Sequence, residues 1–121
     1  MASVETSITS GAIASNATSN ITLTYPSSNK AFYVENISVA LDSAPPSGNT
    51  IVAQITLKPQ EGSNYNVLLN ESNLTLLGTS NFLYLPDTPI LCKSGDTIEI
   101  KVTNNNTSSR TAYVRIVSRL A

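Results

Sequence analysis

The chain of 121 residues has no histidine, no tryptophan and a single cysteine, and only 12% of its residues are charged. Without histidine it lacks the commonest general base and the commonest metal ligand of proteins. The Ser–His and Cys–His arrangements that activate nucleophiles are therefore excluded, and a zinc or copper site of the usual kind cannot be assembled. The lone Cys92 also excludes a disulfide within the chain. We expect a protein that is not an enzyme and binds no cofactor.

Charged residues of both signs are few and scattered. Seven Lys and Arg against eight Asp and Glu leave a net charge of −1 at pH 7. Without a basic stripe, the chain is a poor match for nucleic acid, so we expect no nucleic-acid partner. No segment approaches the ~20 consecutive apolar residues that cross a bilayer, so we expect no membrane insertion. The first five residues lack the basic and apolar regions of a signal peptide, which we therefore do not expect.

Uncharged polar residues take the place of the missing charges: 17 Ser, 14 Thr and 13 Asn make up 44 of the 121 residues. A surface of hydroxyls and amides is wetted without being ionic, so neighbouring subunits do not repel one another. This composition favours an exterior or densely assembled setting. A general compositional bias of the source is the alternative interpretation.

Apolar and polar residues alternate with a period of two along most of the chain, and no helical periodicity is sustained. Residues 51–58 give the clearest stretch, and two shorter strands are expected at 74–77 and 82–85. Turn-forming residues separate the stretches at 26–29, 44–49, 59–64, 87–89, 94–96 and 104–109. The pattern predicts an all-β fold over residues 1–121: a single antiparallel β-sandwich, jelly-roll-like, with eight to ten short strands.

The parity of the alternation predicts which side chains face the interior. It changes between Val34 and Ile37, which predicts a β-bulge or face switch near Glu35 and Asn36. Cys92 follows two apolar residues and is predicted to be a buried small hydrophobe. The other residues predicted to form the core are Ile37, Val39, Leu41, Ile51, Ala53, Ile55, Leu57, Ile98, Ile100, Val102, Val114 and Ile116.

The first 15 residues allow two interpretations. Val4, Thr6 and Ile8 alternate with polar residues, Glu5 is the only charge, and Gly11 offers a hinge. An extended N-terminal arm of this kind can pair with the open sheet edge of another subunit, where main-chain hydrogen bonds supply the affinity. The alternative is an ordinary first strand that pairs within its own sandwich.

Metal binding has little support in the sequence. Five oxygen-bearing side chains lie in expected loops and could contribute to a structural calcium site, but no Asp-x-Asp-x-Asp spacing accompanies them. Their turn-forming tendency explains their positions equally well, so we predict no metal site. These residues are Asp42, Asn49, Glu61, Asp87 and Asp96.

Two further sets of residues are candidates for modification or contact. Seven asparagines precede x-Ser/Thr, against about three expected for random placement, and are possible glycosylation sites: Asn16, Asn20, Asn36, Asn70, Asn73, Asn105 and Asn106. In a domain with few charges, apolar and aromatic side chains on strand faces leave surface that another copy can cover. The predicted subunit contacts are Val4, Ile8, Tyr33, Tyr65, Tyr84 and Tyr113.

Near the end of the chain a Gly-Asp turn at residues 95–96 leads into a Thr/Ile/Val strand, and a polar hairpin returns an aromatic-basic strand at 112–116. This segment, with Leu85 and Pro86 before it, resembles the closing strands of small jelly-roll domains in viral and phage capsid, decoration (cement) and fibre-knob proteins. The resemblance covers residues 31–117 and transfers no binding residue.

The resemblance implies a homo-oligomer that docks on a protein lattice with other capsid proteins, at a virion surface. We expect a trimer or pentamer. A secreted carbohydrate-binding or lectin-like module with an extracellular location is an alternative, and a pilus or filament subunit is another.

Overall fold

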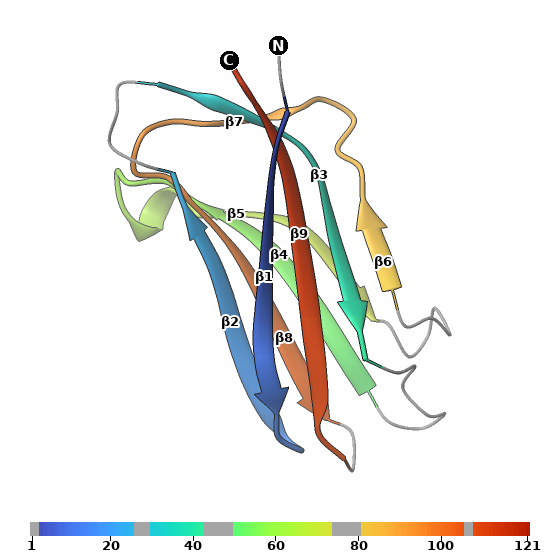
Figure 1. The fold of residues 1–121 in the computed structure, drawn as a ribbon. Helices are drawn as coiled ribbons and strands as arrows, with labels where there is room; N and C mark the ends of the chain where they lie inside the picture. Colours follow the sequence, from blue (N-terminus) through green and yellow to red (C-terminus); the bar gives the residue numbers. More distant parts are fainter. Residues whose placement is uncertain (1–2, 26–29, 43–49, 74–80, 106–107) are drawn as a thin grey trace.

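Two antiparallel sheets pack face to face in the computed structural model, which describes residues 3–25, 30–42, 50–73, 81–105 and 108–121 (Figure 1). Among these residues there are nine strands and one short 3-10 turn, η1. The elements are β1 (Ser3–Ile13), β2 (Ala17–Thr24), β3 (Phe32–Leu41), β4 (Thr50–Lys58), η1 (Ser63–Tyr65), β5 (Val67–Asn73), β6 (Asn81–Tyr84), β7 (Ile90–Cys92), β8 (Thr97–Asn105) and β9 (Arg110–Leu120).

The strand order identifies the sandwich as a jelly roll. The front sheet in Figure 1 has the order β1-β9-β3-β6, with β7 also paired to β3, and the back sheet has the order β2-β8-β4-β5. The pairs β1–β9, β2–β8, β3–β6/β7 and β4–β5 are nested like the arms of one long hairpin that has been rolled up. A rolled hairpin of four strand pairs is the jelly-roll arrangement. The predicted fold class and strand number are confirmed.

The core lies between the sheets, where the predicted alternation places it. In β8 the side chains of Ile98, Ile100 and Val102 are fully buried, while Lys101 between them is exposed. Eleven of the twelve residues predicted for the core are buried, and Leu57 is partly buried and packs against them. The core also contains Ile13, Ile21, Tyr25, Val34, Cys92 and Ala112, so the predicted burial of Cys92 is confirmed.

The change of parity in β3 is a bulge. The pairing of β3 with β9 shifts register between Val34 and Asn36, which leaves Glu35 as the extra residue. Val34 and Ile37 can therefore both point into the core, and both are fully buried. The bulge near Glu35 and Asn36 that the sequence predicts is confirmed.

The first strand belongs to the front sheet of its own chain. β1 pairs antiparallel with β9 of the same chain from Ser3 to Ile13, which favours the internal-strand alternative. Docking of this segment on a neighbouring subunit stays a prediction. Its register shifts between Thr9 and Ala12, where Gly11 has a φ of 69°. A glycine in the left-handed region suits a bulge, and Gly11 serves there rather than as a hinge.

Several expected elements differ from the structure in detail. The short strand β7 was not predicted, and it continues the edge of the front sheet beyond β6. The strand expected at 74–77 lies outside the described residues. β5 begins at Val67, because Tyr65 still belongs to η1.

Candidate interaction surfaces

The calcium candidates that the structure describes are not gathered into one cluster. No group of three or more His, Cys, Asp or Glu side chains that could hold a metal occurs among the described residues. Asp96 is buried and accepts hydrogen bonds from two backbone amides, and Glu61 forms an ion pair of 2.6 Å with Lys93. The hydrogen bond that the Lys93 ammonium donates to the Glu61 carboxylate lowers the pKa of Glu61. Asp42 and Asp87 are exposed, and Asn49 lies outside the described residues.

Neither a reactive thiol nor a membrane-spanning helix is found in the described part of the chain. Burial, and secondarily the charge of Asp96, raises the pKa of Cys92 to about 12. Because the thiolate is the reactive form, a thiol with this pKa is inert at neutral pH. No helix among the described residues is long and apolar enough to cross a membrane.

The seven candidate glycosylation sites differ in exposure. Asn16, Asn20 and Asn105 are exposed. Asn36, Asn70 and Asn73 are partly buried, and the Asn70 side-chain amide donates a hydrogen bond of 2.8 Å to the Ser72 hydroxyl. Asn106 lies outside the described residues. Glycosylation stays a prediction, with the three exposed asparagines as the accessible sites.

Five of the six predicted contact residues fall into two groups. Val4, Tyr65 and Tyr113 expose half of their surface or more, and so remain available to a partner. Ile8 and Tyr84 pack against the core, and burial together with the charge of Asp87 raises the pKa of Tyr84.

Tyr33, the sixth predicted contact, is partly covered by an arginine. The guanidinium carbon of Arg119 lies 4.7 Å from the centre of the Tyr33 ring, which is a cation–π contact. Arg119 also approaches the Glu35 carboxylate at 3.9 Å. Contact by any of the six residues remains a prediction.

Exposed apolar side chains gather along one flank of the sandwich, where β5 is the edge of the back sheet and β6 and β7 form the edge of the front sheet. Six of the eight large hydrophobic residues that are exposed in the described chain lie on or beside these edge strands, and one of the six, Leu83 of β6, leans toward β3 on the outer face of the front sheet. The other five form one set. We call this set the apolar flank: Tyr65, Val67, Leu68, Leu85 and Leu91.

The two halves of the apolar flank are neighbours in space. The opposite edges of the sheets, β1 and β2, contact each other, so β5 and β6/β7 must share the remaining side of the sandwich. Tyr65 from the back sheet and Leu91 from the front sheet line a single hollow of about 410 Å³, together with Leu57. Glu61 and Lys93 pair at its rim, and the buried Asp96 also lines it.

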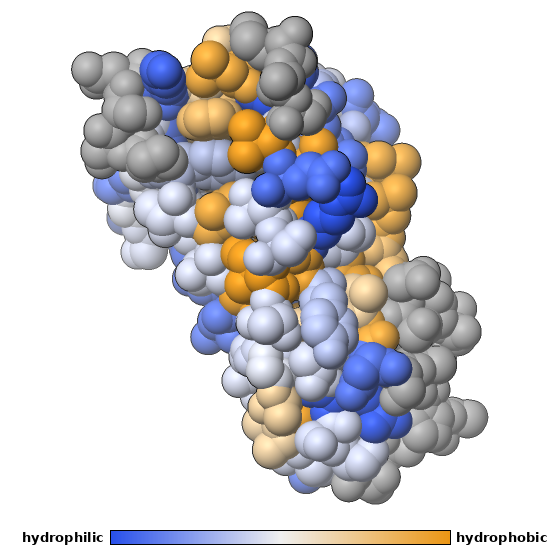
Figure 2. Space-filling view, in the orientation of Figure 1, coloured by the Kyte–Doolittle hydropathy of each residue, from blue (hydrophilic) through white to orange (hydrophobic). Residues whose placement is uncertain are grey.

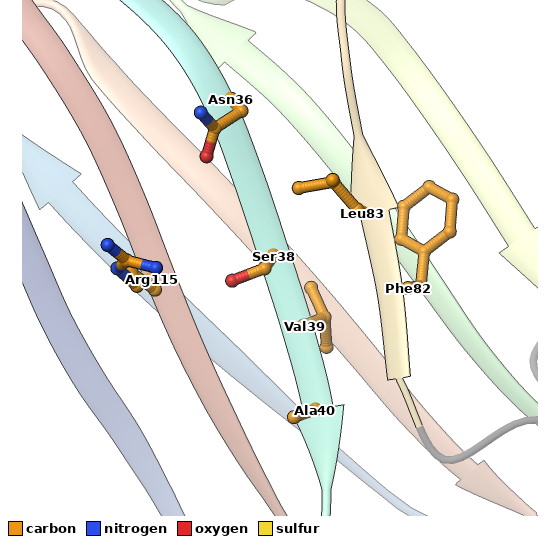
Figure 3. A pocket seen from close by; sticks show the side chains of 7 residues that line it. All are labelled: Asn36, Ser38, Val39, Ala40, Phe82, Leu83 and Arg115. Carbon is orange, nitrogen blue, oxygen red and sulfur yellow. The ribbon is translucent and has the colours of Figure 1, made fainter.

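A second feature lies on the outer face of the front sheet, where small side chains of the central strand β3 are flanked by larger ones. Ser38 lies opposite Arg115 of β9 on one side and Leu83 of β6 on the other. Ala40 lies opposite Tyr113. Figure 3 shows Leu83 leaning from β6 toward β3 and Asn36, Ser38 and Ala40 in a row along β3.

Two adjoining hollows of about 490 and 540 Å³ result, and they share Ser38, Ala40 and Arg115. We call them together the β3 hollow. Arg115 donates a hydrogen bond to the Glu5 carboxylate, so its charge is balanced. Figure 2 shows this face as mainly blue and white, with separate orange patches, and more orange along the flank where β6 lies. The β3 hollow therefore has a mixed lining, in which apolar surface predominates and Asn36, Ser38 and Arg115 supply polar groups, and its ion pair is balanced.

The sequence predicts only parts of these two surfaces. Tyr65 and Tyr113 were predicted as contacts, whereas the exposure of Val67, Leu68 and Leu85 was not. The consecutive apolar residues at 67–69 break the alternation, and this irregularity was the available signal. Nothing local to β3 reveals that its neighbours are β9 and β6.

Comparisons with known proteins agree with the fold. No family model matches the chain, and no curated protein matches its sequence. A mitogen derived from Yersinia pseudotuberculosis has a TM-score of 0.55 at 12% identity, over 93% of this chain and 84% of the mitogen chain. PirA has a TM-score of 0.53 at 9% identity, over 93% of this chain and 92% of the PirA chain.

The acid-stable capsid of the Helicobacter pylori bacteriophage KHP30 contains a further similar chain. Its TM-score is 0.55 at 13% identity, and the match covers 100% of this chain and 92% of the capsid chain. The resemblance to jelly-roll capsid domains is thus confirmed as a resemblance of fold. At such identities the similarity to all three proteins establishes the fold alone.

Proposed function

We propose that this protein is a structural, non-catalytic subunit of a virion surface that assembles with copies of itself and docks on other capsid proteins. The observation that carries the proposal is the apolar flank. Exposed apolar side chains from the edges of both sheets meet there, and clustered exposure of this kind is typical of protein–protein contacts.

The position of the flank favours contact between copies of the same chain. A ring of three or five subunits needs a heterologous contact, in which one surface of each copy meets a different surface of the next. A lateral flank leaves both sheet faces uncovered when such a ring closes. The expected trimer or pentamer is therefore compatible with an exposed outer face on every subunit.

The charge distribution supports dense assembly. The ion pairs Lys58–Glu99 at 2.7 Å and Lys93–Glu61 at 2.6 Å neutralise charges within each subunit. With a net charge of −1, neighbouring copies do not repel one another strongly over the distances of a shell.

The fold comparisons are compatible with a capsid role, because a chain of this fold serves in a phage capsid. The match covers 100% of this chain and 92% of the phage capsid chain. This similarity supports three parts of the proposal: a location in the virion, a structural rather than catalytic role, and other capsid proteins as partners.

The proposal is tested on particles released from the host that carries the gene. Particles purified on a density gradient and treated with protease are analysed by mass spectrometry, with a cytoplasmic host protein as the contamination control. We expect peptides of this chain to co-sediment with the particles in a fixed ratio to the other capsid proteins. Recovery only in the unsedimented fraction would refute a virion location.

A further inference from the structure

We propose that the β3 hollow binds a neutral carbohydrate, with one pyranose ring seated over Ser38 and Ala40 beside Tyr113. This inference is independent of the proposed function, because the hollow lies on the outer face of the front sheet and shares no residue with the apolar flank. It assigns a binding role to a face that a laterally assembled ring leaves exposed.

The hollow is produced by the cross-strand register rather than by a loop. Ala40 directly faces Tyr113, and Ser38 directly faces Arg115. Directly opposed side chains in an antiparallel pair are near neighbours, so each small residue leaves room beside a large one. Because sheet strands hold the lining side chains, the shape is preformed, as ligand sites usually are.

The polar groups of the hollow suit a ligand that both donates and accepts hydrogen bonds. The side chains of Asn36, Ser38 and Tyr113 have no hydrogen-bond partner in the described part of the chain. An amide, an aliphatic hydroxyl and a phenol each donate and accept, which matches the hydroxyls of a sugar. A guanidinium has five N–H donors, so Arg115 retains donors beyond its bond to Glu5.

The aromatic side chain supplies a flat apolar surface at the margin. Tyr113 is 52% exposed, and Leu83 on the other side of β3 is 53% exposed. A half-exposed tyrosine presents an apolar ring and a polar tip together, the combination on which a pyranose ring can stack while its hydroxyls are bonded. The combined hollows of about 490 and 540 Å³ are large enough for a small ligand.

Charge and openness argue against other ligand classes. An anionic ligand would require an unpaired cation, whereas the Arg115 charge is balanced by Glu5. A purely apolar ligand requires an enclosed pocket, whereas the β3 hollow is open, and Asn36, Ser38 and Arg115 add polar groups to its largely apolar lining. A neutral polyhydroxylated ring, with apolar faces and polar edges, fits both the balanced charge and this mixed lining.

The test uses the intact protein on a printed array of neutral oligosaccharides built from glucose, galactose, mannose and N-acetylhexosamines, with sialylated glycans on the same array. Saturation-transfer NMR with the methyl glycosides of these sugars at millimolar concentration provides a second readout. We expect binding to at least one neutral glycan and no preference for the sialylated forms. Two variants probe the hollow: Tyr113→Ala removes the stacking surface, and Ala40→Trp fills the floor.

Both variants should weaken binding at least tenfold while the melting temperature stays close to that of the wild type. Thr22→Ala, at an exposed position of β2 on the other sheet, is the control and should bind within twofold of the wild type. The proposal is overturned if the wild-type protein binds no neutral glycan. This outcome counts against the proposal even if the β3 hollow turns out to bind another protein. Binding restricted to sialylated glycans, or binding that survives both hollow variants, overturns it as well.

Discussion

The carboxylate of Asp96 connects two loops at its end of the sandwich. It accepts hydrogen bonds from the backbone amides of Lys93, at 2.9 Å, and Gln60, at 3.1 Å. The backbone of the same turn pairs with Tyr25 through two bonds of 2.9 Å. Asp96 thereby joins the β7–β8 turn, the segment after β4 and the end of β2.

Replacing Asp96 by alanine is expected to reduce the free energy of unfolding by about 2–4 kcal/mol, because two amides lose a charged acceptor. Urea denaturation measures the change. Asp87→Ala, at an exposed loop position, is the control and should change stability by less than ~0.5 kcal/mol. A loss below ~1 kcal/mol for Asp96→Ala would show that water replaces the carboxylate.

Two buried residues make stability depend on alkaline pH. Burial raises the pKa of Tyr25 from its ordinary value of 10.0 to about 12, and that of Cys92 from 9.0 to about 12. Both groups are neutral when protonated, so the unfolded chain loses these protons first as the pH rises. Their contribution is complete below about pH 9 and is lost as the pH approaches 12.

Urea midpoints measured between pH 7 and pH 11.5 should therefore be level up to about pH 9 and then fall. In Cys92→Ala the decline should begin nearer pH 10, because the groups with raised pKa that then remain include Tyr25 and Tyr84, whose ordinary pKa is 10.0. The comparison uses the shape of the curve rather than its height. A wild-type midpoint that is the same at pH 11 as at pH 7 would contradict the buried ionisation of both groups.

At the scale of the element, β4 shows how alternation determines burial. Ile51, Ala53 and Ile55 are fully buried, while the residues between them are only partly covered. Ile55→Ala is expected to cost about 2–5 kcal/mol, as large-to-small changes in a packed core do. Leu83→Ala, at an exposed position of β6 outside the apolar flank, is the matched control and should cost less than ~0.5 kcal/mol in urea denaturation. Equal effects of the two changes would mean that β4 has been assigned the wrong face.

The pairing of β1 with β9 predicts the effect of removing residues 1–10. The deletion takes away most of the β1 main-chain pairing and uncovers Val114 and Ile116, which lie opposite Ile8 and Thr6. Differential scanning calorimetry should record a melting temperature lowered by 10 °C or more. An unchanged melting temperature with loss of assembly would instead show that the segment docks on a neighbouring subunit.

Strand positions were predictable because burial on one face imposes a period of two on the sequence, and the bulge at Glu35 was visible as a break in that period. The contacts between residues far apart in the chain were not predictable from the sequence. The sequence puts Tyr25 on the same face as Ile21 and Leu23, but it does not show that the phenol reaches Ser118, 93 residues away, at 2.7 Å. The sequence also does not show that the Phe32 ring packs near the Tyr25 ring, with 5.3 Å between the ring centres.

At the scale of the whole molecule, function depends on which strands become edges, and local patterns do not encode this. Residues 67–73 read as one strand among several, yet the topology makes β5 an edge and brings it beside β6 and β7. The same topology makes β3 central, so that its small residues become the floor of the β3 hollow. Both surfaces therefore follow from strand order, which is a global property of the chain.

Self-assembly through the apolar flank is the central claim, and multi-angle light scattering at micromolar concentration tests it most directly. The wild type should have a mass that is three or five times 12.8 kDa. A Leu68→Asp/Leu85→Asp variant should be a folded monomer of 12.8 kDa, whereas Asn20→Asp, which adds one charge on the exposed face of β2, should assemble like the wild type. A wild-type protein that stays monomeric throughout the micromolar range would contradict the claim.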